Sequence, residues 1–368
     1  MNNEYHRNWL ALLRLPQLGP RGFITILEHY PNLADFFEAK PWRVPQFTQD
    51  QCDFLDHPPW HDVDRDLAWA AQPRRHILTL DDPHYPFLLK QIADPPPVLY
   101  VEGDPQALSE PQIAIVGSRH PTPAGRQIAA HFAQHLAKQG FIITSGLALG
   151  IDTAAHEGAL KTGRTLAVKG CGPDFIYPHQ NRSLASKIIE KCAIVSEFWP
   201  GTPPHAKHFP KRNRIVSGLS LGTLVVEAAL KSGSLITARL ALEQDREVFA
   251  IPGSVHNPVA RGCNYLIRQG AHLVESADDL LAVLNPLLFE PQNIPICENP
   301  NFPLAPQDKN LLKCIGFELT LVDQIISYSG LDASLVCARL VELELSGYIL
   351  AVPGGYVRSN SSALHYLD

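Results

Sequence analysis

One short segment of the chain concentrates residue types that bind nucleic acids. His208–Arg214 reads His-Phe-Pro-Lys-Arg-Asn-Arg, so three cations fall within four residues, just after an aromatic ring. No acidic residue occurs between Phe198 and Val226 to neutralise them. Cations bind phosphates and an aromatic face stacks on a base, which is the chemistry of single-stranded nucleic acid binding. The residues we predict to form this binding loop are Phe209, Lys211, Arg212, Asn213 and Arg214.

Other turns carry groups that suit an anion. Gly117-Ser118-Arg119 follows a short apolar strand, where a turn offers backbone amides and Arg119 adds a forked cation. Ser234 stands where a helix is expected to begin, and Asn264 follows a later strand. Because these loops follow strands of one predicted sheet, we expect them to close the same groove. Asp152 is predicted to be a helix N-cap.

Several enzyme and metal motifs fail on spacing. The chain has neither G-x-G-x-x-G nor a P-loop, which argues against a dinucleotide site and an ATP-driven motor. Gly218-Leu219-Ser220-Leu221-Gly222 matches a nucleophile elbow, but its strand comes after the serine instead of before it. The histidine pairs His57/His61 and His131/His135 lack the glutamate of a zinc protease, and the seven cysteines are scattered. We therefore predict no catalytic serine and no metal.

The elements that must position these groups alternate between strand and helix. The short apolar runs predict strands at 113–116, 141–144, 165–168, 193–195, 223–226, 248–251 and 272–274. Helical stretches such as 124–138 and 235–244 separate most of them. This alternation predicts a doubly wound, Rossmann-like α/β sheet, in which ligands bind at the carboxyl ends of the strands.

Composition shifts divide the chain into four parts. We expect a helical N-terminal domain with a connector at 1–105, a Rossmann-like domain at 106–284, a proline-rich linker at 285–307 and a winged-helix domain at 308–368. The N-terminal part contains a helix–turn–helix around 9–30, which is either a helix-hairpin-helix or a plain αα turn. The third helix of the winged helix, around 333–345, is acidic, which favours a protein contact over DNA reading.

Length and charge set outer bounds on the protein. The chain has 368 residues, 45% of them hydrophobic, so it can bury a core in two or three domains. It has no apolar run of about 18 residues and no basic, apolar leader, so we expect a cytoplasmic protein without membrane insertion. The net charge of −6 by itself disfavours nucleic acid, and only the local basic segment argues for it.

Taken together, these segments resemble the DprA/Smf family of bacterial DNA-processing proteins. The resemblance covers the central block, and two positions depart from the usual pattern: Ala124-Gly125, where an aromatic normally precedes the glycine, and Lys169, where a small apolar residue is usual. The matching segments are Ile113–Arg119, Ser145–Ala148, Gly150–Asp152 with His156, Tyr177-Pro178 with Asn181, Phe209–Arg214 and Ser232–Ala238.

The resemblance implies a single-stranded DNA-binding protein and not an enzyme, with no cofactor. It implies that the protein protects incoming DNA during natural transformation (competence), helps to load the RecA recombinase in DNA recombination, and forms a homodimer through the Rossmann-like domain. Arg119 and Lys211 would contact the DNA backbone, Arg212 and Arg214 would shape the pocket, and Phe209 would stack on a base. The other predicted site residues are Asn213, Gly117, Ser118, Ser234 and Asn264.

Two other functions remain open at this point. Gly222-Thr223 with Glu227 resembles the G-G-x-G-T-x-x-E signature of nucleotide phosphoribohydrolases, although the spacing differs by one residue. The alternative to DNA binding is therefore a nucleotide-binding or phosphoribohydrolase-like Rossmann enzyme. A third hypothesis makes the chain an interaction scaffold that uses its acidic winged helix.

Overall fold

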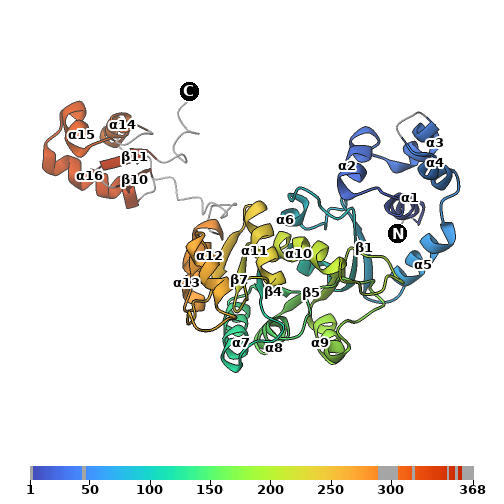
Figure 1. Ribbon diagram of the computed structural model, residues 1–368. Helices are drawn as coiled ribbons and strands as arrows, with labels where there is room; N and C mark the ends of the chain where they lie inside the picture. Colours follow the sequence, from blue (N-terminus) through green and yellow to red (C-terminus); the bar gives the residue numbers. More distant parts are fainter. Residues whose placement is uncertain are drawn as a thin grey trace. The chain divides into compact units, whose positions relative to one another are not determined.

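The computed structural model describes residues 3–43, 47–288, 306–316, 320–345, 348–352 and 355–358. It divides into two compact units, Met1–Phe289 and Glu290–Asp368. Each unit is described by itself below, and Figure 1 shows their elements.

The N-terminal part of the first unit is helical. Its elements are α1 (Asn3–Leu13), α2 (Pro20–His29), α3 (Leu33–Ala39), the 3-10 turn η1 (Pro41–Arg43), α4 (Gln49–Asp56) and α5 (Trp60–Ala70). The predicted helix, turn and helix are present, and Pro20 opens α2, a position that needs no backbone N–H donor. Large aromatic side chains fill the interior between these helices, with Trp9, Phe23, Phe36 and Trp42 each at most 1% exposed.

A nine-stranded sheet forms the centre of the unit, in the order β1-β2-β6-β5-β4-β3-β7-β8-β9. Its strands are β1 (Arg75–Thr79), β2 (Val98–Gly103), β3 (Gln112–Val116), β4 (Ile142–Ser145), β5 (Thr165–Val168), β6 (Ala193–Ser196), β7 (Gly222–Val225), β8 (Glu247–Ala250) and β9 (His272–Leu273). The seven strands β3 to β9 run parallel, as predicted to within about two residues. β1 and β2, which were not predicted from the sequence, add an antiparallel edge on β6.

Helices cover both faces of this sheet (Figure 1). They are α6 (Phe87–Lys90), α7 (Pro123–Lys138), α8 (Ile151–Ala159), α9 (Arg182–Lys191), α10 (His208–Gly218), α11 (Gly233–Glu243), α12 (Arg261–Arg268) and α13 (Ala277–Leu288), with 3-10 turns η2 (Pro105–Ser109) and η3 (His179–Asn181). Along β3, Ile113 and Ile115 pack with α7 and α8, whereas Ala114 and Val116 face the core that holds α10 and α11. Burial on both faces explains why the strand sequences are continuously apolar.

The order of the strands creates a crevice at one place. From β3 the chain proceeds through β4, β5 and β6 in one direction, then returns to β7 on the other side of β3 and continues to β8 and β9. The loops after β3 and β7 therefore leave the sheet in opposite directions. Open α/β sheets bind ligands at such a switch point.

The second unit has the predicted winged-helix elements. They are α14 (Pro306–Lys313), α15 (Val322–Ser329), α16 (Ala333–Leu345), β10 (Ile349–Val352) and β11 (Gly355–Arg358). Leu311, Ile325, Val336 and Leu340 pack into one small core. The strands pair antiparallel, as a wing requires.

The four-part division of the chain stays a prediction. Two of its predicted boundaries, near residues 105 and 285, do not coincide with the ends of structural elements. β1 and β2 lie in the part expected at 1–105, yet they belong to the central sheet. The expected linker at 285–307 begins inside α13, which ends at Leu288, and residues 289–305 lie outside the described residues. Among the helices of the described residues, none is long and apolar enough to cross a membrane.

Candidate nucleic-acid interface

A pocket of about 770 Å³ opens at the switch point between β3 and β7. Its walls come from five places far apart in the sequence, namely 116–119 at the end of β3, 146–152 after β4, Tyr177, 204–216 before and in α10, and 229–237 at the start of α11. The crevice expected from the strand order therefore exists, and it has the size of an ordinary ligand site.

The basic segment is a helix and not the predicted loop. α10 begins at His208, so Phe209–Arg214 occupy its first two turns. Successive side chains of a helix point in different directions, about 100° apart, which separates the predicted cations. Phe209, Arg212 and Asn213 line the pocket, whereas Lys211 and Arg214 do not.

The first wall of the pocket pairs a cation with an aromatic ring. The guanidinium carbon of Arg119 lies 5.6 Å from the centroid of the Phe209 ring, and the Tyr177 ring lies 5.7 Å from Phe209 on the pocket wall. Gly117 and Ser118 line the same wall, and the Ser118 carbonyl accepts a hydrogen bond from Ile151 that joins the turn to α8. This wall offers one guanidinium and two ring faces to a ligand.

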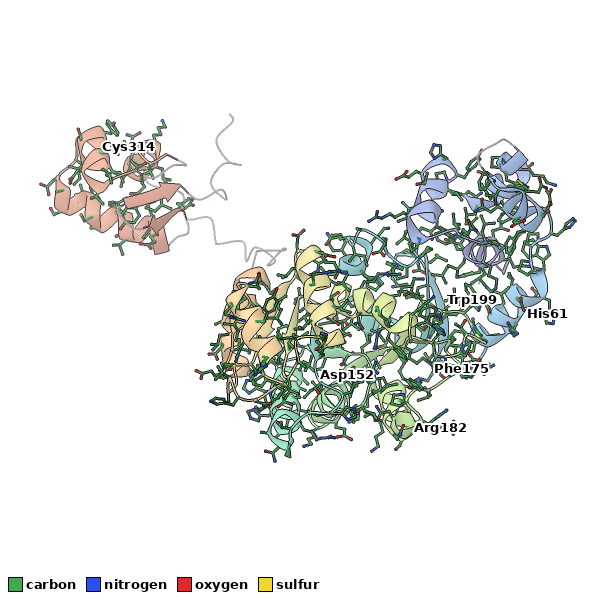
Figure 2. All side chains as sticks on the ribbon, viewed as in Figure 1. His61, Asp152, Phe175, Arg182, Trp199 and Cys314 are labelled. Carbon is green, nitrogen blue, oxygen red and sulfur yellow. The ribbon has the colours of Figure 1, made fainter. Side chains whose placement is uncertain are left out.

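A buried charged pair forms the floor. Arg212 is 4% exposed and donates to the Val168 carbonyl, while Asp152 is 7% exposed and accepts from the amides of Gly146 and Ala148. Burial raises the pKa of Asp152 and lowers the pKa of Arg212, and in each case the opposite charge of the other residue opposes the shift. Asp152 is thus not the N-cap that we predicted, because Gly150 holds that place. Figure 2 labels Asp152 near the middle of the first unit.

Two of the predicted cations are held by carboxylates from elsewhere in the chain. The Arg214 guanidinium lies 2.5 Å from Glu197 and 3.2 Å from Asp94, and the Lys211 ammonium lies 3.3 Å from Glu197. The sequence expectation that no carboxylate neutralises the segment is therefore wrong. Arg214 is buried and structural, whereas about half of the Lys211 side chain is exposed beside the pocket.

The remaining predicted residues divide between the pocket and the scaffold. Asn213 and Ser234 line the pocket. The Ser234 hydroxyl is hydrogen-bonded to the hydroxyl of Ser232, the residue that caps α11. Asn264 does not line it: its side chain bonds both the amide and the carbonyl of Gly253 and so fixes that loop.

One cation of this pocket, Lys231, was not predicted from the sequence. Lys231 lines the same pocket as Arg119, and it stands directly before the Ser232–Ala238 segment. It is exposed, and the ion pairs found among the described residues leave it without a carboxylate partner. Its position beside a glycine-containing helix start was the available signal. The charged lining is then Arg119, Arg212, Lys231 and Asp152, a net positive surface.

The residues of the enzyme alternative have other tasks. The Glu227 carboxylate accepts from the Thr122 amide at 2.8 Å and from its hydroxyl at 2.6 Å, and Thr122 in turn caps α7. Ser220 is buried and donates to the Val216 carbonyl. His156, part of the family resemblance, is buried against Thr165. No cluster of three metal-ligating side chains occurs in the part of the chain that the structure describes.

Comparison with known proteins decides the family. Residues 76–285 match the family model of DNA recombination-mediator protein A, and residues 298–355 match that of the DprA winged helix domain. The first match alone spans more than half of the chain. The chain belongs to the DprA/Smf family.

Relatives in this family match most or nearly all of the chain. Protein Smf of Escherichia coli K12 is 41% identical over 357 residues, which is 95% of both proteins. The DNA processing protein DprA of Streptococcus pneumoniae is 45% identical over 266 residues, 70% of this chain and 91% of that protein. The chain is therefore a DNA-processing protein of the DprA family.

Two solved DprA structures share the fold. The X-ray structure from Streptococcus pneumoniae superposes with a TM-score of 0.67 at 35% identity and covers 75% of this chain and 97% of that one. A Helicobacter pylori structure, described as giving insight into a single-stranded DNA binding mode, has a TM-score of 0.52 at 35% identity, with 57% and 96% covered. These structures confirm the DprA fold, and the match to the DprA winged helix domain confirms the winged helix.

Proposed function

We propose that the pocket binds single-stranded DNA, with Arg119 and Lys231 on the phosphates and Phe209 beside Tyr177 against a base. The observation that carries this proposal is the placement of Arg119 5.6 Å from the Phe209 ring inside a pocket of net positive charge. A ring face can stack only on a base that is out of a duplex, which favours single strands. The single-strand binding described for the Helicobacter pylori relative supports the same assignment.

Lys211 and Arg214 take different parts in this proposal. Lys211 is exposed enough to leave Glu197 and reach a phosphate, because about half of its side chain is in contact with solvent. The Glu197 carboxylate keeps its ion pair with Arg214 when Lys211 leaves. Arg214 stays in the core and holds α10 in place through Glu197 and Asp94. Arg212 is part of the buried floor of the pocket.

The test measures the affinity for a labelled single-stranded oligonucleotide by fluorescence anisotropy over a salt series, with duplex competitor. We expect the protein to bind the single strand more tightly than the duplex competitor. We expect Arg119→Ala to bind the single strand more weakly, with the slope of log K against log salt reduced by about 0.7 for one lost phosphate contact. Lys138→Ala is the matched control, since it removes one exposed cation at the far end of α7. Equal loss in both variants, or no preference for single strands, contradicts the proposal.

We propose further that the protein is not an enzyme. Glu227 caps the start of α7 through Thr122 and does not line the pocket. A carboxylate occupied by two donors is a poor general base. We expect no base release from nucleoside monophosphates, measured by chromatography, and turnover that Glu227→Gln abolishes would establish the enzyme alternative instead.

Membership of a family of DNA recombination mediators supports the wider role. We propose that the protein protects incoming strands in the cytoplasm during natural transformation, acts as a homodimer and helps to load RecA. Light scattering measures the dimer. RecA filament formation on an oligonucleotide precoated with single-strand-binding protein measures loading, and Arg119→Ala should slow it if loading requires the pocket.

A further inference from the structure

The segment that connects β6 to α10 forms one edge of the pocket. We call Trp199–Ala206 the proline segment, because it reads Trp-Pro-Gly-Thr-Pro-Pro-His-Ala. Pro204 and Ala206 line the pocket, and α10, which supplies Phe209 and Arg212, starts two residues later. Each proline has a fixed φ, so the place where the segment starts strongly restricts where it ends.

The middle of the proline segment is tied to the loop after β5. The Gly201 amide donates to the carboxylate of Asp174 at 2.9 Å, and the Thr202 carbonyl accepts from Gly172 at 2.8 Å. That loop is itself held by Lys169, whose buried ammonium donates to the carbonyls of Pro173 and Phe175. Lys169, the residue that departs from the usual family pattern, thus holds the loop to which the proline segment is hydrogen-bonded.

The start of the segment is tied to the N-terminal helices. The guanidinium carbon of Arg14, just after α1, lies 4.8 Å from the centroid of the Trp199 ring. Arg14 is oriented by Asp66 of α5 at 2.7 Å, and the Asp66 carboxylate also accepts from the Tyr100 hydroxyl at 2.7 Å. Figure 2 shows Trp199 on the side of the sheet that faces α5, with Phe175 below it.

The arginine end of this contact is buried and oriented by Asp66. Only 6% of the Arg14 side chain and none of the Asp66 side chain is exposed. A cation on a ring face is attracted more strongly when it is desolvated, and an arginine that is already ion-paired loses little freedom in making the contact. The ring of Trp199 is therefore held by a rigid partner that belongs to a different part of the chain.

We propose that Trp199, held by Arg14, positions the proline segment, so that the N-terminal helices set the geometry of the binding pocket. Neither residue lines the pocket, so both are positioning residues. The effect on affinity rests on the proposed DNA function, whereas the positioning of the segment does not. Because coupling is reciprocal, a strand bound in the pocket also strengthens the Arg14–Trp199 contact.

The variant Trp199→Leu removes the ring face and leaves the Arg14–Asp66 pair intact. We expect its affinity for the single-stranded oligonucleotide to fall about 5- to 30-fold, the range of a partly desolvated cation–π contact. The salt slope should stay at the wild-type value, since no phosphate contact is removed. Trp199→Tyr keeps a ring face and should recover most of the affinity.

Trp60→Leu is the matched control. It also removes a tryptophan ring that contacts an arginine, since the guanidinium carbon of Arg7 lies 5.0 Å from the centroid of the Trp60 ring. Trp60 lies at the start of α5, outside the proline segment, and like Trp199 it does not line the pocket. Its affinity should equal that of the wild type. An equal loss in Trp60→Leu and Trp199→Leu would overturn the proposal, because it would mean that any damage to the N-terminal helices acts alike.

Hydrogen exchange without DNA separates this proposal from the proposed function. In Trp199→Leu, or in Trp199→Met against Trp60→Met should the leucine variant not fold, the Gly201 amide should exchange faster while the amides of β3 and β4 keep wild-type rates. Unchanged exchange at Gly201, or faster exchange throughout the sheet, overturns the positioning role. A wild-type protein that binds no single strand refutes the proposed function and leaves the exchange result standing.

Discussion

The carboxylate of Glu197 lies 3.3 Å from the ammonium of Lys211 and keeps that cation beside the pocket and not in it. Glu197 directly precedes Phe198, whose ring also lies 5.4 Å from the same ammonium. Lys211 therefore has to exchange one negatively charged partner for another when a phosphate arrives. The competition between Glu197 and a phosphate is a testable property of this site.

Glu197→Gln should bind single-stranded DNA more tightly than the wild type. The variant frees Lys211, whose half-exposed ammonium lies 3.3 Å from the buried Glu197 carboxylate, so we expect a gain in affinity of about fivefold, which corresponds to about 1 kcal/mol. The buried Arg214 loses its nearer carboxylate, so we also expect the free energy of unfolding in urea to fall, by at most about 3–5 kcal/mol because Asp94 remains.

Anisotropy at fixed salt measures this gain, and Glu243→Gln is the control. It makes the same charge change in an exposed pair with Arg239 on α11, so its affinity should stay near wild type. Weaker binding by a folded Glu197→Gln protein would mean that Glu197 orients Lys211 toward the strand and does not compete for it.

Phe209→Leu should weaken binding without altering its salt dependence. Stacking of a base on an aromatic ring is worth about 1–3 kcal/mol, so we expect roughly a 5- to 150-fold loss of affinity. No charge is removed, so the slope of log K against log salt should match that of the wild type. Phe87→Leu, which replaces a ring that is 68% exposed elsewhere, serves as the control. A shallower slope in Phe209→Leu would show that the ring acts mainly by orienting Arg119.

Gly146→Ala should damage the pocket floor. A Cβ at this position would lie 2.1 Å from the Arg212 guanidinium, so the buried side chain would have to move. Overpacking of this kind costs about 1–3 kcal/mol, which we expect in urea unfolding together with weaker DNA binding. Gly19→Ala is the control, since nothing lies within 4 Å of a Cβ there. Wild-type behaviour of Gly146→Ala would show that Arg212 has room to shift.

Stability should fall at mildly acidic pH because of His156. Burial, and then the positive charge of Arg212, lower the pKa of His156 to about 3. The unfolded chain binds a proton near pH 6.5 and the native state does not, so this contribution is complete above that pH and is lost progressively toward pH 3. At pH 5 the loss should reach about 2 kcal/mol.

Urea unfolding of the wild type and of His156→Gln at pH 7.5 and pH 5 isolates this contribution, because the other titrating groups cancel. The wild type should lose about 2 kcal/mol more than the variant over this interval. The same pH dependence in both proteins would mean that His156 takes up its proton in the native state.

Much of the scaffold could be read from local sequence. The apolar runs such as Ile113–Val116 predict the strands β3 to β9, because a strand buried on both faces has to be apolar throughout. Their alternation with helices predicts the parallel sheet, and the glycine-containing turns after β3 and β7 locate the pocket. These features depend on neighbours along the chain, which periodicity reports directly.

The sequence was less informative about which side chains face the pocket. Phe209–Arg214 were expected in a loop, and only the helix that contains them separates Arg212 from Lys211 by direction. Polar runs at the start of a helix and in a loop look alike, since both contain prolines and cations. Asn264 was expected at the groove, but its side chain is instead hydrogen-bonded to the amide and the carbonyl of Gly253.

Residue types, spacing and periodicity were therefore sufficient to predict the α/β sheet, the winged helix and the basic site at the strand ends. Only the tertiary structure decided that Asp94 and Glu197 neutralise Arg214, that β1 and β2 join the sheet, and that Arg14 meets Trp199. The physical reason is distance along the chain. Strand and helix patterns arise from neighbouring residues, whereas ion pairs and ring contacts join segments that folding alone brings together.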